Sequence, residues 1–149
     1  MNYLGLNKYD TANGPGIRVS LFVSGCTIHC QDCFNKESWD FNAGKPFTDK
    51  IQEDIIKTLQ EPYINGLSIL GGDPLEPKNQ DTVLSLVKAV RASTSKSIWI
   101  WTGRIHQQVK DNPILKYIDV LIDGPYIHSL KPVQYAGSSN QNIIFLRKK

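Results

Sequence analysis

The sequence predicts an α/β fold: an open, partial (βα) barrel with a mostly parallel sheet of about five to six strands. Predicted strands and helices alternate at intervals of roughly 20 to 30 residues, which is the pattern of right-handed βαβ units. The chain has 149 residues, too few for a closed eight-stranded barrel of roughly 250. Neither a repeat nor a linker interrupts the pattern, so we expect a single domain over residues 1–149.

The first half of the chain supplies two strands and two helices. Residues 18–23 form a β-branched and aromatic run that ends at a Ser-Gly pair, which predicts a strand. Residues 48–60 predict a helix with Thr48 as its N-cap and with three isoleucines and a leucine on one face. Residues 67–70 are a short apolar run closed by two glycines. Residues 80–92 then place apolar side chains at helical spacing.

The second half continues the alternation. Residues 97–102 predict a strand that is stopped by a glycine, and a short polar helix is expected at 105–110. A turn follows at Asn112-Pro113. Residues 120–122 predict another strand, stopped by Asp-Gly-Pro, and residues 143–146 the last one.

The unusual motifs all follow predicted strands. In parallel α/β folds, ligands bind outside the carboxyl ends of the strands. We therefore expect these motifs to meet at one edge, called the rim below. It comprises Ser-Gly-Cys (24–26), Gly-Gly-Asp-Pro (71–74), Thr-Gly-Arg (102–104) and Asp-Gly-Pro-Tyr (123–126).

All three cysteines of the chain, Cys26, Cys30 and Cys33, fall within one loop, residues 26–33, called the cluster loop below. Iron–sulfur clusters normally take four cysteine ligands, so three thiolates in this spacing leave one iron open. An open coordination position distinguishes a reactive metal centre from a structural one. An odd number of closely spaced cysteines does not suit a disulfide scaffold.

Composition excludes several classes of protein. A hydrophobic fraction of 40% and a charged fraction of 21% are those of a globular chain. The net charge is +3, but the basic residues form no stripe with interleaved aromatic residues, so we expect no nucleic-acid binding. No run approaches the roughly 18 apolar residues of a membrane span, and no secretory signal is visible. Together with the thiols, this predicts a protein of the reducing cytoplasm.

Ordered motifs make the chain resemble a known superfamily. The cluster loop after a first strand, with Gly-Gly-Asp-Pro after the next, resembles the radical S-adenosylmethionine (SAM) superfamily. Residues 10–40, DTANGPGIRVSLFVSGCTIHCQDCFNKESWD, are similar to the activating enzymes of glycyl radical enzymes. WIWTGR (99–104), DVLIDGPY (119–126) and GSSNQNII (137–144) narrow the resemblance to activases of anaerobic ribonucleoside-triphosphate reductase. The resemblance extends from about residue 2 to residue 146.

The resemblance implies the chemistry. The three cysteines would hold a [4Fe-4S] cluster, and SAM would chelate the open iron through its amino and carboxylate groups. Reductive cleavage of SAM would give a 5′-deoxyadenosyl radical, which abstracts hydrogen from a glycine of the reductase. A flavodoxin-like donor would supply the electron, since no second cysteine cluster is present to relay one. The turn at residues 13–16 would border the opening through which the target peptide enters.

The resemblance also implies which residues contact SAM: Phe34, Asn35, Gly71, Gly72, Asp73, Thr102, Arg104 and Asp123. Two glycines let the backbone approach a ligand closely, so a carbonyl or carboxylate near Asp73 can receive the ammonium of SAM. Many members of the superfamily carry Glu at the position of Asp73. Asp32 stands where members of the superfamily often have an aromatic residue that packs near the adenine of SAM. Phe34 would make this contact instead. Taken alone, Gly-Gly-Asp-Pro favours a simple turn between a strand and a loop; beside the cysteine motif, it favours a SAM contact.

Two alternatives remain open. A related activase could act on another glycyl radical enzyme, of the pyruvate formate-lyase type. The chain could also be a non-catalytic iron–sulfur or metal-binding module for electron transfer. The absence of a fourth cysteine argues against that second alternative, because an electron carrier benefits from a fully ligated cluster.

Overall fold

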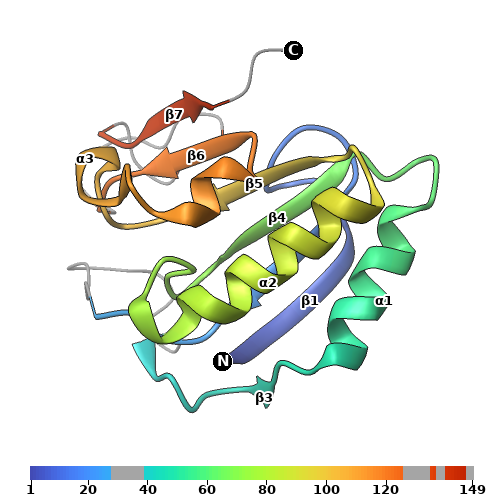
Figure 1. Ribbon diagram of the computed structural model, residues 1–149, viewed down its shortest axis with the longest axis horizontal. Coiled ribbons are helices and arrows are strands. Elements are labelled where there is room, and N and C mark those ends of the chain that lie inside the picture. The colour runs from blue at the N-terminus through green and yellow to red at the C-terminus, as the bar shows by residue number, and fades with distance from the viewer. Residues whose placement is uncertain (28–38, 126–134, 137–139, 147–149) are drawn as a thin grey trace.

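The computed structural model describes residues 1–27, 39–125, 135–136 and 140–146 (Figure 1). Within these residues, seven strands form one sheet in the order β3-β1-β2-β4-β5-β6-β7. The strands are β1 (Asn2–Asp10), β2 (Arg18–Val23), β3 (Lys45–Pro46), β4 (Gly66–Gly71), β5 (Ser97–Trp101), β6 (Val120–Asp123) and β7 (Asn142–Phe145). The helices are α1 (Asp49–Leu59), α2 (Pro77–Ser93), α3 (His106–Val109) and a 3-10 helix at Pro113–Lys116.

The sheet is mixed, so the prediction of a mostly parallel, partial (βα) barrel of five to six strands is wrong. Only the four central strands, β2, β4, β5 and β6, run parallel to one another. β1 pairs antiparallel with β2, β3 with β1, and β7 with β6. Parallel neighbours require a crossover of a dozen or more residues. Residues 11–17, which join β1 to β2, are too few for one, and the described residues contain only three α-helices.

The two long helices match their predictions. Helix α1 lies within the predicted range of 48–60, and Thr48 Oγ1 accepts a hydrogen bond from the backbone N–H of Ile51, as expected of an N-cap. Helix α2 contains the predicted range of 80–92 and begins earlier, at Pro77. Strands β1 and β3 were not predicted.

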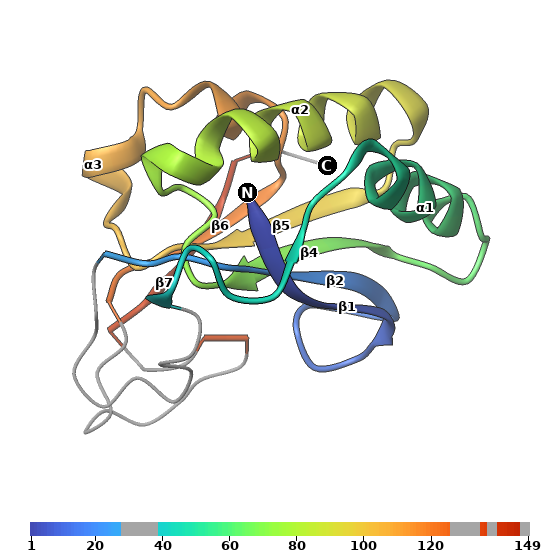
Figure 2. The ribbon, with the colours of Figure 1, turned by 90° about the horizontal axis from the view of Figure 1, so that it is seen from below.

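Helices α1 and α2 cover one face of the sheet (Figure 2). The main hydrophobic core lies between this face and the two helices. β2 contributes Val19, Leu21 and Val23, all fully buried, while Ile55 and Leu59 pack down from α1. Burying apolar side chains in this layer supplies most of the driving force for the fold. No helix in the described part of the chain is both long and apolar enough to span a membrane.

The opposite face of the sheet carries polar and aromatic side chains. Ser20 of β2 is in register with Ser68 of β4, which is in register with Trp99 of β5. The Trp99 ring packs edge-on against Tyr135, with ring centroids 5.3 Å apart. The Trp101 indole N–H donates to the Tyr135 carbonyl at 2.6 Å. Tyr135 therefore lies against this second face.

A hydrogen-bond network fixes the turn between β1 and β2 onto the second face. Ser68 Oγ donates to the Asn13 carbonyl at 2.6 Å and accepts from Arg18 Nε at 2.8 Å. Asp10 accepts from the Asn13 side chain and from Ser20 Oγ, both at 2.6 Å. The turn at residues 13–16 is thus attached to the body of the sheet at the end opposite the rim.

Candidate metal centre and cofactor site

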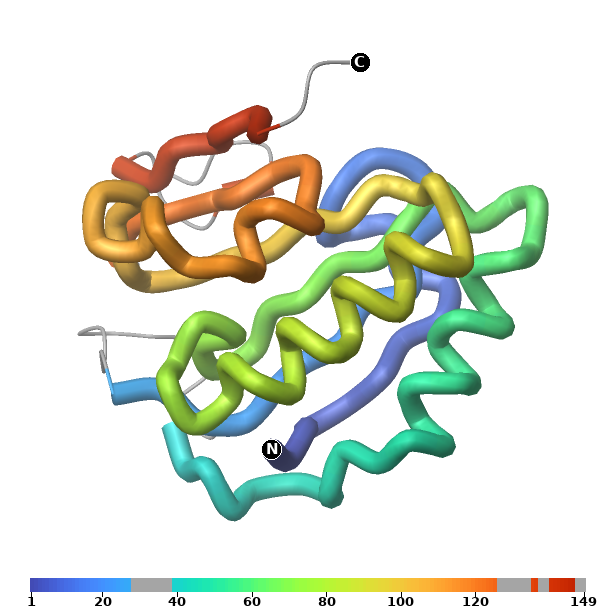
Figure 3. Tube along the Cα trace, viewed as in Figure 1, coloured from blue at the N-terminus to red at the C-terminus, as the bar shows by residue number. Residues whose placement is uncertain are grey.

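The four parallel strands bring the predicted rim together, at the left of Figure 3. Val23 at the end of β2 is in register with Gly71, and Trp101 at the end of β5 is in register with Ile122. The loops beyond these ends bond to one another. The Asp73 N–H donates to the Gly25 carbonyl at 2.8 Å. The Gly124 N–H donates to the Arg104 carbonyl at 2.9 Å.

Cys26 opens the cluster loop at the rim. The residue is 9% exposed, and its backbone N–H donates to the Trp39 carbonyl at 3.3 Å. The preceding Gly25 has a φ of +104°, and a Cβ there would lie 2.0 Å from the ring of Phe41. Only glycine fits this combination of left-handed backbone and close packing. Cys30, Cys33, Phe34 and Asn35, predicted to complete the metal and SAM sites, lie outside the described residues.

Gly71 brings the backbones of β2 and β4 into close contact beside the cluster loop. Its φ is +115°, and a Cβ on it would lie 2.6 Å from both N and O of Val23. The next residue, Gly72, donates its N–H to the Val23 carbonyl at 2.8 Å. The two glycines therefore lock the start of the Gly-Gly-Asp-Pro loop to the strand that leads into Cys26.

Asp73 is fully buried, and its carboxylate is surrounded by donors from the chain itself. Oδ1 accepts from the Leu75 N–H, and both oxygens are within 3.0 Å of Thr102 Oγ1. Oδ2 also accepts from the Gly103 N–H and from Arg104 Nη1, both at 3.0 Å. Burial raises the pKa of Asp73, although the Leu75 N–H and the Arg104 guanidinium oppose that rise. The carboxylate thus holds two loops of the rim together.

Glu76 is a site residue that the sequence analysis missed. It is 2% exposed, and its Oε1 accepts from both the backbone N–H and the hydroxyl of Thr27, at 2.6 and 2.7 Å. Its Oε2 lies 3.2 Å from Arg104 Nη2. The available signal was an acidic side chain three residues after Asp73, just before the proline that begins α2.

Asn79, also missed, connects the same loops from the first turn of α2. Its side-chain amide donates to the carbonyls of Ser24 and Asp73, at 2.9 and 3.1 Å. The signal was a polar side chain on a helix whose apolar face is otherwise regular. Together with Asp73 and Glu76, Asn79 fixes the geometry around Cys26.

Asp123 lies at the far side of the rim, at the end of β6. Its carboxylate accepts from the backbone N–H groups of His106, at 2.7 Å, and Asn142, at 3.2 Å. It thereby ties β7 and the start of α3 to β6. The structure brings Cys26, Asp73, Thr102 and Arg104 together. Asp123 is connected to this group through the next residue, Gly124, whose N–H donates to the Arg104 carbonyl.

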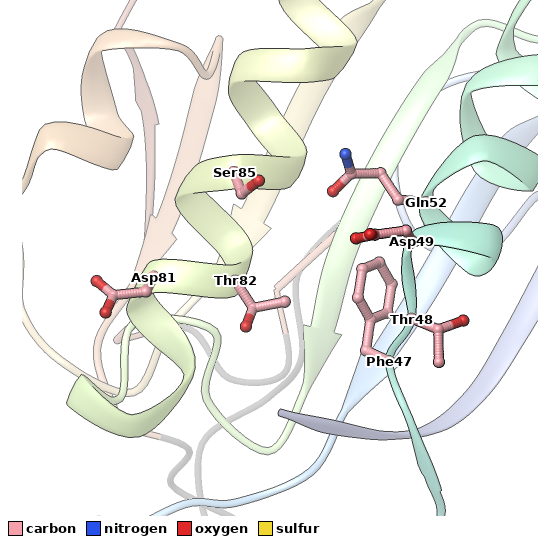
Figure 4. A pocket seen from close by; sticks show the side chains of 7 residues that line it. All are labelled: Phe47, Thr48, Asp49, Gln52, Asp81, Thr82 and Ser85. Carbon is pink, nitrogen blue, oxygen red and sulfur yellow. The ribbon is translucent and has the colours of Figure 1, made fainter.

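A groove on the helical face is separate from the rim (Figure 4). It encloses about 270 Å³ between α1 and α2. None of the predicted site residues lines it. Its lining residues are Phe47, Thr48, Asp49, Gln52, Asp81, Thr82 and Ser85.

The residues at the rim fit a [4Fe-4S] cluster. Thiolates are the ligands that such clusters take. Cys26 stands at the end of a buried strand, where its own N–H donates to Trp39 and the next residue, Thr27, donates to Glu76. Gly25 and Gly71 leave the neighbouring backbone without side chains in the way. The buried carboxylates are satisfied by protein donors, so the thiolates are the donor set that suits iron.

Comparison with known proteins first defines the class. The family profile of the 4Fe-4S single cluster domain matches residues 12–144. This range contains the cluster loop, the whole rim and six of the seven strands at least in part. The class is therefore that of single-cluster iron–sulfur domains.

Individual relatives define the family. The anaerobic ribonucleoside-triphosphate reductase-activating protein of Escherichia coli K12 is 41% identical, over 99% of this chain and 100% of the relative. The protein of the same name from Enterobacteria phage T4 is 41% identical, over 96% and 93%. That of Haemophilus influenzae is 43% identical, over 96% and 97%. The chain belongs to the family of anaerobic ribonucleoside-triphosphate reductase-activating proteins.

Proposed function

We propose that the protein is a radical SAM activase that generates a glycyl radical on anaerobic ribonucleoside-triphosphate reductase. The observation that carries the proposal is the position of Cys26, at the rim where the loops of three parallel strands are bonded together. The nearly full-length similarity to reductase-activating proteins supports the choice of partner. When bound, the cluster and SAM supply the reductive cleavage that yields the 5′-deoxyadenosyl radical.

In this proposal, the residues of the chain bind and orient the cluster and SAM. Cys26, Cys30 and Cys33 are the cluster ligands. Backbone carbonyls of Gly71 and Gly72 receive the ammonium of SAM, because the Asp73 carboxylate is already occupied by four donors of the chain. Thr102 and Arg104 shape the same wall of the site through their bonds to Asp73.

The remaining predicted contacts complete the cofactor site. Phe34 and Asn35 follow the third cysteine and are assigned to SAM, with Phe34 beside the adenine. Asp123 is assigned to the far side of the rim. The cofactors carry the difficult chemistry. The protein therefore has to exclude water and to hold one carbon–hydrogen bond of the target glycine at contact distance.

The partner presents a glycine-bearing loop to this site. The flanking amide nitrogen and carbonyl stabilise a radical at the glycine Cα, which makes its hydrogen the favoured one to abstract. The electron comes from a separate, flavodoxin-like donor, because the three cysteines of the chain form one motif only. The protein acts in the cytoplasm, where thiolates stay reduced.

Product analysis tests this proposal. The protein is reconstituted with iron and sulfide under anaerobic conditions and then given SAM and a reductant. We expect 5′-deoxyadenosine from the wild type and none from Cys26→Ala. A wild type that holds a [4Fe-4S] cluster but leaves SAM intact would contradict the proposal and favour an electron-transfer module. Exchanging the reductase for pyruvate formate-lyase tests the partner, and radical formation only on the latter would contradict the assignment.

A further inference from the structure

Glu76 holds Thr27 in place, and Thr27 directly follows Cys26, the first of the three cysteines. Its Oε1 accepts two hydrogen bonds from Thr27, one from the backbone N–H at 2.6 Å and one from the hydroxyl at 2.7 Å. Bonds of this length to a carboxylate are charge-assisted and stronger than neutral ones. Because Thr27 is bonded covalently to Cys26, the carboxylate of Glu76 fixes the start of the cluster loop against the start of α2.

Glu76 contributes a carboxylate to a buried group of three ionisable side chains. The Arg104 guanidinium bridges two buried carboxylates, with Nη1 3.0 Å from Asp73 Oδ2 and Nη2 3.2 Å from Glu76 Oε2. The exposed fractions of the two acidic side chains are 0% and 3%, and that of Arg104 is 21%. Replacing Glu76 by a neutral side chain would remove one negative charge from this buried group. The field of that charge is screened far less in this buried position than it would be in water.

Both features act on the reduction potential of a cluster bound to Cys26. Net charge and hydrogen bonds to the sulfur atoms are two of the factors that set such potentials. A nearby negative charge disfavours adding an electron. The Thr27 N–H and hydroxyl, which directly follow the Cys26 thiolate in the chain, both donate to Glu76. Glu76 therefore withholds these donors from the cluster while it adds negative charge.

We propose that Glu76 is a positioning residue that secures the cluster loop through Thr27 and keeps the reduction potential of the bound cluster low. This inference rests on the proposed function only in placing the cluster on Cys26. A low potential strengthens the reduced protein as an electron donor to SAM, so the effect serves the proposed reaction directly. Arg104 and Asp73 support the role by holding the Glu76 carboxylate in place.

A redox titration of the reconstituted protein, followed by electron paramagnetic resonance (EPR), tests the proposal. In Glu76→Gln the amide oxygen can still accept from Thr27, but the negative charge of Glu76 is lost. We expect a higher midpoint potential than in the wild type. Glu53→Gln on α1, where the side chain is exposed, is the matched control and should keep the wild-type potential. Equal potentials in Glu76→Gln and wild type would overturn the proposal.

The variant Thr27→Val distinguishes the role of Glu76 in placing the cluster loop from the effect of its charge on the potential. It removes the hydroxyl bond but leaves the Glu76 carboxylate in place, so we expect faster loss of iron to a chelator without a raised potential. A potential raised as much as in Glu76→Gln, or an unchanged rate of iron loss, would contradict the proposal.

If Glu76→Gln takes up too little iron for titration, Glu76→Asp replaces it, since it keeps the charge. Because the shorter Asp side chain keeps the charge but cannot reach Thr27 as Glu76 does, the proposal then requires faster loss of iron to a chelator than in the wild type, and an unchanged rate contradicts it. Failure of the proposed function gives a different result, namely a wild type that forms no [4Fe-4S] cluster or cleaves no SAM.

Discussion

At the scale of single residues, Arg18 shows how a buried charge organises the end of the sheet opposite the rim. Its guanidinium is fully buried beneath Trp99, with Cζ 5.5 Å from the ring centroid. It donates to the hydroxyls of Ser68 and Ser97 and to the Leu67 carbonyl, at 2.8 to 3.0 Å. Burial lowers the pKa of Arg18 to about 10, so the side chain stays charged at neutral pH.

Arg18→Lys tests this arrangement. Lysine keeps the charge but cannot reproduce the planar set of donors. Each buried acceptor left without a donor costs about 1–3 kcal/mol, so we expect the free energy of unfolding, measured with urea on the apo-protein, to fall by at least that much. Lys57→Arg, at an exposed position on α1, should change it little. Equal stability of Arg18→Lys and wild type would show that the guanidinium fork is dispensable.

Asp10 gives the fold a defined pH dependence. Burial acts to raise the pKa of Asp10, but hydrogen bonds from Ser20, Ala12 and Asn13 outweigh it, and the pKa falls below its ordinary value of 3.8. The ionised form is therefore favoured in the folded state. The stability it contributes is present above pH 3.8 and is lost as the pH falls through the lowered pKa.

Asp10→Asn removes this contribution. We expect the difference in free energy of unfolding between wild type and variant to be largest near neutral pH and to shrink below pH 3.8. Urea unfolding of both proteins across that range measures it. A difference that stays constant with pH would mean that the carboxylate is not the source of the effect.

Single residues also show which parts of the site could be predicted from the sequence and which could not. Cys26 was predicted from the spacing of the three cysteines, and Asp73, Thr102 and Arg104 from their position in loops after strands and from the family resemblance. Glu76 and Asn79 were missed because their partners, Thr27 and Ser24, are distant in the sequence and meet them only once β2 and β4 are side by side. Their roles depend on tertiary contacts that no local pattern contains.

At the scale of elements, the strength of the local pattern decides what can be predicted. Helices α1 and α2 were predicted because their apolar side chains recur at helical spacing. Strand β1 was missed because its sequence, NYLGLNKYD, contains no β-branched residue and interleaves Gly, Asn and Lys with apolar residues. It is a strand because β2 offers a backbone to pair with. The direction of β7 is likewise set by its pairing with β6 rather than by its own residues.

Gly71→Ala tests the contact between β2 and β4. The new Cβ would meet the backbone of Val23 at a left-handed φ. A residue held in such a conformation costs about 1–3 kcal/mol, so we expect that loss in unfolding free energy, together with less iron bound per protein. Gly5→Ala on β1 is the matched control, because its Cβ would have no atom within 4 Å. If both variants behaved alike, the close approach would have no consequence.

At the scale of the whole molecule, the arrangement of the rim was predicted better than the shape of the fold. The rim depends only on the four central strands being parallel, and these are joined by helices that the sequence shows clearly. The barrel prediction extended the same rule to the outer strands. It failed there because β1, β3 and β7 pair antiparallel with their neighbours, and residues 11–17 between β1 and β2 are too few for a crossover.

The central claim is that this site places a radical on a glycine of anaerobic ribonucleoside-triphosphate reductase. The most direct test is EPR of the reductase after anaerobic incubation with the reconstituted protein, SAM and a reductant. The account predicts a glycyl radical signal that requires SAM and is lost with Cys26→Ala. A reductase that remains EPR-silent, although the protein holds its cluster and the reductant is active, would contradict it.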